Sequence, residues 1–306
     1  MNDVMLPLAD DIYFLKGKND AKYPYSHSLL IGNCLIDTGI SREHLKLLKA
    51  NNFSIDTIIL SHWHEDHIRD ALFLKANHYL SHPKDKPMIE NFSGLFKKIT
   101  GISEEDFQKF GDFITSYLKT LRIKNIKIDR VIEDGEIIEI NEECRLKVIH
   151  TPGHTAGHCS FMELNSGIVY LTDIDFKDFG PFYGAQDSSL TDFENSIEKV
   201  KKIDMDIAIS AHKGIFNGRN LIREKLDEYK AIIDKRDEKI LEFFSETRTI
   251  KVEDLLLKNI IYKTLHEIDF FKAHYIRYEK HMLEQHFERL ISRNIIESKG
   301  NSCVLA

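Results

Sequence analysis

The chain has 306 residues, of which 42% are hydrophobic and 30% charged, so it can bury one large core and carry a small second domain. Its formal net charge of −7 at pH 7 creates no overall field that would concentrate it on nucleic acid or on an anionic membrane. It contains no run of about 18 apolar residues and does not begin with the basic and then apolar pattern of a secretory signal. We therefore expect a cytoplasmic protein with no membrane partner.

The N-terminal part of the chain predicts short strands that lead into a histidine cluster. Residues 12–15 and 29–36 have strand patterns, and the second ends at 37–39, where a glycine marks a turn. A helix is predicted over 42–51, followed by a β-branched strand over 56–60. This strand runs directly into the sequence from Ser61 to His67, and a helical pattern follows. The cluster is therefore expected on a strand-to-helix loop.

The middle of the chain alternates between helical and strand patterns. Residues 85–127 have apolar side chains at helical spacing, which predicts a helical insertion. Strand patterns resume at 131–132, 137–140, 146–149 and 169–172, and a helix is expected over 191–203 with Thr191 as its N-cap. A last strand over 207–210 then leads to His212.

The pattern from residue 220 onward is mainly helical. A long helix is expected over 221–246, and short apolar segments at 295–297 and 303–305 around Gly300 suggest a final hairpin. We place a first domain at residues 1–230 and a small C-terminal domain at residues 231–306. Helices followed by a hairpin are typical of a winged-helix-like unit, although a plain helical cap fits the pattern equally well.

Histidine or aspartate follows an apolar strand at four separate places. Imidazole nitrogen and carboxylate oxygen are the ligands that zinc and similar divalent ions take. Alternate residues of an extended segment point the same way, so the first two histidines of the cluster can bind one ion and the next two residues a second. The four places are His62-x-His64-x-Asp66-His67, then His154 after Thr151-Pro152-Gly153, then Asp173, and finally His212.

The order H-x-H-x-D-H, then T-P-G-H-T-x-G-H, then an aspartate and a histidine that each follow a strand, resembles the metallo-β-lactamase superfamily over about residues 10–215. The resemblance implies an α+β fold of the αβ/βα sandwich type, with the helical insertion and the C-terminal unit added to it. It assigns one ion to His62, His64 and His154 and a second to Asp66, His67 and His212, with Asp173 bridging them. Asp66 would also be catalytic, because it would orient the attacking hydroxide and accept its proton.

Three further residues are assigned supporting or binding roles. Asp37 lies in a segment that matches the family's L-I-D-T-G and is expected to orient the metal loop, while His158 is expected to support the site and not to bind an ion. Tyr183 is expected to line the pocket and to hydrogen-bond a substrate oxygen. The insertion is well placed to form a lid over an apolar substrate.

The leading hypothesis is an enzyme that hydrolyses an ester, thioester or lactone with two divalent metal ions, with zinc expected and iron or manganese as alternatives. The core resembles the glyoxalase II-like and lactonase branches of the superfamily. Phe176 departs from acyl-homoserine lactonases, which have a tyrosine at that position, and no evident set of basic residues would bind glutathione. The expected partner is a small-molecule substrate, and dimerisation through the insertion or the tail is left open.

Three other functions stay open. The tail is similar to that of β-lactamase-like endoribonucleases, which makes a metal-dependent phosphodiesterase or endoribonuclease an alternative. The tail is nevertheless balanced in charge, with no aromatic series that could track a nucleic-acid strand, so nucleic acid is not favoured as a partner. A mononuclear-iron dioxygenase and a non-catalytic metal-binding regulator are the remaining alternatives.

Overall fold

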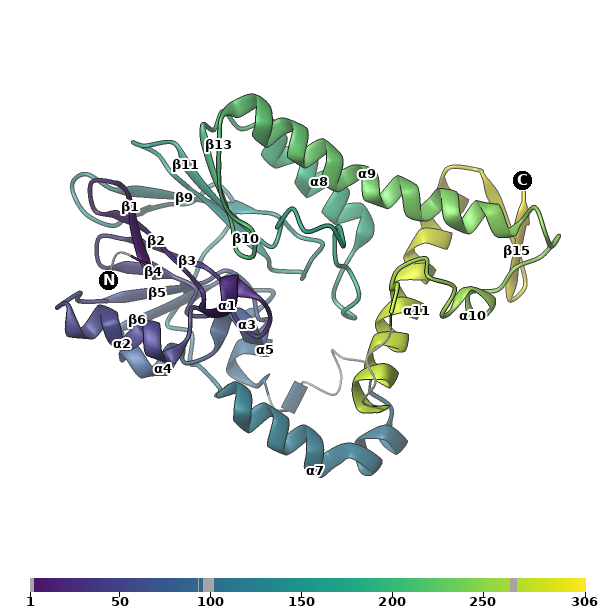
Figure 1. Ribbon diagram of the computed structural model, residues 1–306, viewed down its shortest axis with the longest axis horizontal. Coiled ribbons are helices and arrows are strands. Elements are labelled where there is room, and N and C mark those ends of the chain that lie inside the picture. The colour runs from purple at the N-terminus through teal and green to yellow at the C-terminus, as the bar shows by residue number, and fades with distance from the viewer. Residues whose placement is uncertain (1–2, 93, 96–101, 265–268) are drawn as a thin grey trace.

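The fold is a pair of β-sheets packed face to face, with helices on their outer faces (Figure 1). The computed structural model describes residues 3–92, 94–95, 102–264 and 269–306. Within those residues, one sheet has the strand order β1 (Met5–Ala9), β2 (Ile12–Leu15), β3 (Ser28–Ile31), β4 (Cys34–Ile36), β5 (Thr57–Leu60), β6 (His78–Ser81) and β7 (Arg130–Val131). The other has the order β13 (Gly214–Asn217), β12 (Ile207–Ser210), β11 (Ile168–Thr172), β10 (Cys159–Glu163), β9 (Arg145–His150) and β8 (Ile137–Glu139). The predicted α+β sandwich is confirmed.

The helices follow the predicted order, with some boundaries shifted. They are α1 (Lys18–Ala21), α2 (Arg42–Ala50), α3 (Glu65–Ile68), α4 (Ala71–Leu74), α5 (Lys86–Glu90), α7 (Glu104–Leu121), α8 (Leu190–Lys201), α9 (Arg219–Phe243), α10 (Val252–Leu255) and α11 (Asp269–Ser292). The expected N-cap Thr191 is wrong, because Thr191 already lies in the first turn of α8. Ser189 is the cap and accepts a hydrogen bond from the N–H of Asp192 at 3.2 Å. None of the described helices is long and apolar enough to cross a membrane.

Apolar side chains fill three layers of the sandwich. Between the sheets, Phe14 and Ile31 of one sheet pack in the same cluster as Phe161 and Tyr170 of the other. A second cluster joins the first sheet to α2, and a third joins the second sheet to α8 and α9. Strand β11 is buried at every position, as expected for a strand covered on both faces. Four of the described strands escaped prediction, namely β6, β10, β13 and the edge strand β1, whose apolar pattern Pro7 interrupts. The single strand predicted over 29–36 is wrong, because this segment turns back on itself as the antiparallel pair β3 and β4.

Parallel pairing brings the ligand-bearing loops to one edge of the sandwich. Strand β5 pairs in parallel with β4 and β6, and β11 pairs in parallel with β12. Because the carboxyl ends of parallel strands meet at the same edge, the segments that follow β4, β5, β11 and β12 all begin there. These segments contain Asp37, the cluster from His62 to His67, Asp173 and His212.

The insertion and the tail extend from this core. In the insertion, α5 and α7 are helical as predicted, while part of the expected helical pattern, at 93 and 96–101, lies outside the described residues. Helix α9 runs without a break through the expected domain boundary at residue 230. The tail then forms α10, α11 and a hairpin of β14 (Ile296–Lys299) and β15 (Ser302–Leu305), seen at the right of Figure 1. The predicted hairpin is therefore present, and the division into two domains and the winged-helix assignment stay predictions.

Candidate metal centre

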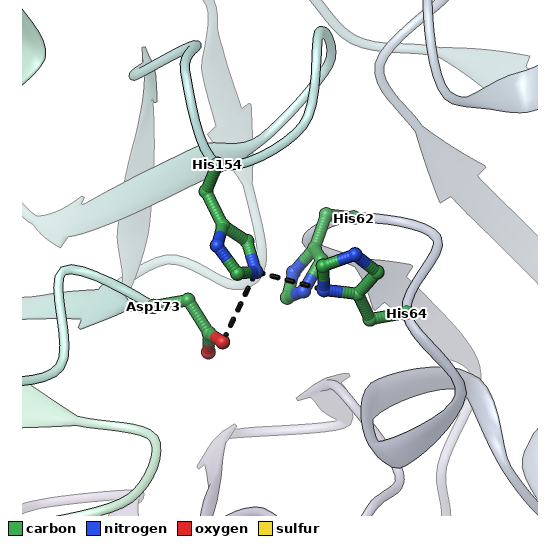
Figure 2. Close-up of side chains that lie close together, drawn as sticks. All are labelled: His62, His64, His154 and Asp173. Atoms are coloured by element: carbon green, nitrogen blue, oxygen red, sulfur yellow. Dashed lines mark hydrogen bonds and ion pairs between the residues drawn. The ribbon is translucent and has the colours of Figure 1, made fainter. Parts of the chain in front are cut away.

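The predicted ligands converge at the edge of the sandwich in groups whose ligand atoms lie within 4.8 Å of one another. Asp173 belongs to more than one group, so it lies where a bridging ligand would be needed. The groups are His62, His64, His154 and Asp173 (Figure 2), then Asp66, His67 and His212, and finally Asp173, Asp175 and His212. All seven predicted ligands are thus brought together. Asp175 was missed, although its alternation with Asp173 in the sequence could have indicated it.

Three imidazoles present a nitrogen to the cluster without a hydrogen-bond partner. Among the described residues, Nε2 of His62, His67 and His212 is buried without a hydrogen bond of regular geometry. Carboxylates lie beside two of them: Oδ1 of Asp173 is 2.9 Å from Nε2 of His67, and Oδ2 of Asp66 is 3.4 Å from Nε2 of His212. The opposite nitrogen is held in place: Nδ1 of His212 donates to the carbonyl oxygen of Ala21 at 2.8 Å. Nδ1 of His67 donates to Oδ2 of Asp37 at 2.7 Å. Buried lone pairs beside carboxylate oxygens are what a divalent cation requires, so these residues fit a metal site.

His154 connects the two histidines of the cluster to the aspartate that follows β11. Its Nε2 lies 2.8 Å from Nδ1 of His64 and 3.2 Å from Oδ2 of Asp173, as the dashed lines in Figure 2 mark. Its Nδ1 donates to the carbonyl oxygen of Phe182 at 3.1 Å, which fixes the orientation of the ring. The loop that contains Phe182 is therefore attached directly to a predicted ligand.

Burial sets the protonation of the central side chains. Burial, with neighbouring histidines, lowers the pKa of His62 and of His64 well below the usual value. Both imidazoles are therefore neutral near pH 7, which is the form that binds a metal ion. Burial alone would raise the pKa of Asp173, but the histidines around it outweigh that effect and hold its pKa well below the usual range.

Asp37 hydrogen-bonds to the loop that contains His62 to His67, which fits the expectation that it orients this loop. Its carboxylate accepts hydrogen bonds from the N–H of Ser61 at 2.8 Å and from the Ser61 hydroxyl at 2.7 Å, in addition to the one from His67. The Ser61 hydroxyl oxygen also lies 3.0 Å from Nδ1 of His62. One carboxylate thereby orients two predicted ligands.

His158 supports Asp173, the aspartate that is shared between the groups of predicted ligands. Its Nε2 accepts a hydrogen bond from the N–H of Asp173 at 3.1 Å, and its Nδ1 donates to the carbonyl oxygen of Thr151 at 2.9 Å. With one nitrogen donating and the other accepting, His158 has no nitrogen directed at an ion. The contacts fit the supporting role expected of this residue.

Asp85 joins two of the ligand loops and was missed by the sequence analysis. Its carboxylate accepts hydrogen bonds from the N–H of Trp63 at 3.0 Å, the hydroxyl of Thr155 at 2.7 Å and the N–H of Gly157 at 2.6 Å. Trp63 lies between two predicted ligands and Thr155 follows a third. Burial and the nearby Asp187 raise the pKa of Asp85 to about 7. No local sequence pattern around residue 85 distinguishes it from a solvent-exposed turn aspartate.

A cavity of about 360 Å³ opens onto the predicted ligands. Among the described residues, half of the twenty that line it are Phe, Tyr or Trp, and they come from parts of the chain that are distant in sequence. Tyr117 of α7 and Phe271 of α11 meet with ring centroids 5.2 Å apart, so the insertion and the tail both form walls of the cavity. The remaining aromatic residues are Tyr23, Trp63, Phe179, Phe182, Tyr229, Tyr262, Tyr275 and Tyr278.

Tyr183 lies outside this lining. It is fully buried, and its hydroxyl donates to Nε2 of His286 at 2.7 Å and accepts from Arg236 at 2.9 Å. The expected hydrogen bond from Tyr183 to a substrate is therefore wrong for this structure, because the Tyr183 hydroxyl already bonds to His286 and Arg236 of the tail. The neighbouring Phe179 and Phe182 line the cavity in its place.

Residues 25–212 match a family described as the metallo-beta-lactamase superfamily. Relatives include a beta-lactamase-like protein 2 homolog of Drosophila melanogaster, 26% identical over 243 residues, which are 75% of this chain and 70% of that protein. The hydroxyacylglutathione hydrolase GloC of Haemophilus influenzae is 26% identical over 193 residues, which are 60% of this chain and 80% of that protein.

Solved structures share the fold over nearly the whole chain. A beta-lactamase domain protein from Burkholderia ambifaria aligns with a TM-score of 0.74 at 15% identity and covers 99% of this chain and 94% of its own. A metallo-beta-lactamase family protein from Thermus thermophilus aligns with a TM-score of 0.67 at 20% identity and covers 96% of this chain and 93% of its own. The likeness thus extends beyond the sandwich into the tail.

Proposed function

Because the chain belongs to the metallo-β-lactamase superfamily, we propose that it hydrolyses the carbonyl group of an ester, thioester or lactone with the help of two divalent metal ions. His62, His64 and His154 would hold one ion, Asp66, His67 and His212 the other, and Asp173 would bridge them. Bound there, the ions would lower the pKa of water toward neutrality and polarise a carbonyl oxygen. Zinc suits this set of nitrogen and carboxylate ligands, as do iron and manganese.

The protein's own side chains prepare this chemistry. Asp66 lines the cavity, and its Oδ2 lies 3.4 Å from Nε2 of His212, so it can accept the proton of the attacking water. Asp37 and His158 fix the rings and the carboxylate that surround that position. The apolar walls of the cavity exclude bulk water and so strengthen each electrostatic contact inside it.

The charged residues that line the cavity indicate which class of substrate it can bind. Among the described residues that line it, Lys177 is the single lysine or arginine, and its Nζ lies 2.8 Å from Oδ2 of Asp175. Two bound ions could themselves hold a phosphoryl oxygen, but a nucleic-acid strand or a peptide carboxylate that extends away from the ions would require basic partners that this lining does not supply. A neutral carbonyl substrate needs none. Relatives that are named hydroxyacylglutathione hydrolases support thioesters within this class.

The test is metal content and substrate range on one preparation. We expect about two zinc, iron or manganese ions per chain by elemental analysis and turnover of a simple thioester, ester or lactone. His64→Ala should lose bound metal and activity together, while His78→Ala, at an exposed histidine in β6, should retain both. Circular dichroism would verify that both variants are folded.

Three results would contradict the proposal. Cleavage confined to a phosphodiester or a short single-stranded RNA would identify a nuclease. One iron per chain with oxygen uptake would identify a dioxygenase, and bound metal without turnover of any of these substrates would point to a regulator.

A further inference from the structure

We propose that the cavity selects an uncharged acyl group that carries an aromatic ring, an inference that rests on the proposed carbonyl hydrolysis and adds a substrate class to it. Aromatic residues make up 10% of the chain but half of the described cavity lining. Aromatic side chains bind planar rings through offset and edge-to-face contacts, which add to the gain from burying apolar area. Such a concentration beside a metal centre favours a ring in the substrate.

The aromatic wall begins directly beside the predicted ligands. The ring of Phe182 lies with its centroid 6.2 Å from that of His64, 5.8 Å from that of His154 and 5.2 Å from that of Tyr278. A carbonyl placed at the ligands therefore has its acyl substituent against Phe182. Farther along, Phe179 and Tyr262 stack with centroids 5.3 Å apart and an interplanar angle of 30°. The tail supplies both tyrosines, so it takes part in substrate selection.

Charged side chains in the cavity already have partners. Lys177 is paired with Asp175. Glu65 accepts a hydrogen bond from the Tyr23 hydroxyl at 2.6 Å, and that hydroxyl also contacts Tyr117. No lysine or arginine among the described lining residues is left to receive a substrate anion, and the remaining carboxylates of the lining, Asp66 and Asp173, are predicted metal ligands. A neutral ring loses the least hydration on entering such a site.

The chain carries its own reporter for ligand entry. Trp63 is the only tryptophan in the sequence, and it lines the cavity, with its ring centroid 4.4 Å from that of His64. Tryptophan emission therefore measures binding separately from turnover. Suitable ligands are amides that resist hydrolysis: 4-bromophenylacetamide, whose bromine quenches at short range, 3,3-dimethylbutyramide, and its cationic isostere trimethylammonioacetamide.

We expect 4-bromophenylacetamide to quench Trp63 emission in a saturable way. In competition with it, phenylacetamide should bind at least about tenfold more tightly than 3,3-dimethylbutyramide or trimethylammonioacetamide. In turnover, the S-phenylacetyl thioester of N-acetylcysteamine should exceed the S-acetyl thioester by a similar factor in kcat/KM. Phe182→Leu keeps an apolar side chain but removes the ring, so it should reduce both ratios by about threefold to tenfold. Phe216→Leu is the matched control, because Phe216 packs against Phe176 outside the cavity lining.

The outcomes separate the two proposals. Thioester turnover without any phenyl preference, and without a response of Trp63, would overturn the aromatic selection and leave the hydrolase proposal intact. A Trp63 response with phenyl preference but no carbonyl turnover would overturn the hydrolase proposal and support the aromatic site. Tighter binding of trimethylammonioacetamide would overturn the inference in favour of a cation site, and an equal loss of the ratio in Phe216→Leu would overturn the role of Phe182.

Discussion

Oδ2 of Asp37 lies 2.7 Å from Nδ1 of His67, and this contact ties the end of strand β4 to the metal loop. Both side chains are completely buried. The hydrogen bond fixes the tautomer of His67 and so leaves its Nε2 lone pair directed at the cluster. The orientation of a predicted ligand therefore depends on a residue from a different strand.

Asp37→Asn should weaken metal binding without removing a ligand. The amide would present an N–H₂ group where the carboxylate accepts hydrogen bonds, so His67 would lose its fixed tautomer. We expect metal affinity to fall about 10- to 100-fold, the usual effect of losing such a partner. Competition with a chelator would measure it. Asp56→Asn is the matched control, because Asp56 lies immediately before β5 and hydrogen-bonds Thr57 and Asn77, not a predicted ligand; an equal loss there would contradict the role of Asp37.

Gly39 allows the chain to pass close to the metal loop. A Cβ atom at this position would lie 1.7 Å from the carbonyl oxygen of Asp66 and 2.1 Å from the hydroxyl oxygen of Ser26. Gly39→Ala should therefore displace the loop, lower the unfolding free energy by about 2 kcal/mol or more, and reduce bound metal. Denaturant unfolding and elemental analysis would measure both effects.

Gly111→Ala in α7 should stabilise the protein, and it serves as the control for Gly39→Ala. An added Cβ there has open space around it, and alanine is favoured in helices. We expect a gain of about 0.5 to 1 kcal/mol in unfolding free energy and unchanged metal content. A loss of stability at both glycines would contradict the steric explanation for Gly39.

The seven predicted ligands could be read from the sequence because each lies within a few residues of an apolar strand end, and strand ends meet at one edge. Asp175 shares that position and could have been included. Asp85 could not, because its three donors come from loops about 22 to 72 positions away in the chain, and only packing brings them together.

The residues that form the cavity walls could not be predicted from local sequence patterns either. Tyr117 and Phe271 belong to helices whose aromatic residues are typical of any packed helix, and nothing in either segment indicates that the two rings meet. Tyr183 was expected at the substrate because it follows Asp173, the predicted bridging ligand, closely in the sequence. Its hydroxyl instead bonds to the tail, whose position the sequence does not specify.

Asp85→Ala should destabilise the two loops that it joins. The substitution leaves the N–H groups of Trp63 and Gly157 without their acceptor, and a buried donor left unpaired costs about 1 to 3 kcal/mol. We expect a loss on the order of 3 kcal/mol in thermal or denaturant unfolding. Asp85→Asn retains one acceptor oxygen and should lose less. Because asparagine keeps the volume of aspartate, equal losses in the two variants would show that both carboxylate oxygens are required as acceptors. Unchanged stability in Asp85→Ala would contradict the role of Asp85 in joining the loops.

A buried chain of hydrogen bonds ties the tail to the cavity wall. Arg236 donates to the Tyr183 hydroxyl, which donates to Nε2 of His286, and Nδ1 of His286 donates to Oδ1 of Asp237 at 2.6 Å. This pattern requires His286 to be neutral. Burial, with the Arg236 guanidinium close by, lowers the pKa of His286 to about 3.

The unfolding free energy should therefore decrease as the pH is lowered, because of His286. Between about pH 6.5 and pH 3 the unfolded chain binds a proton at this residue and the folded chain does not, so acid favours unfolding by up to about 1.4 kcal/mol per pH unit. In His286→Gln, which cannot titrate, the unfolding free energy should fall by about 1 kcal/mol less than in the wild type between about pH 6 and pH 5. Comparing the two proteins removes the contribution of the metal-site histidines, which they share. Parallel pH profiles would mean that folding does not lower the pKa of His286, which would contradict the neutral hydrogen-bond chain.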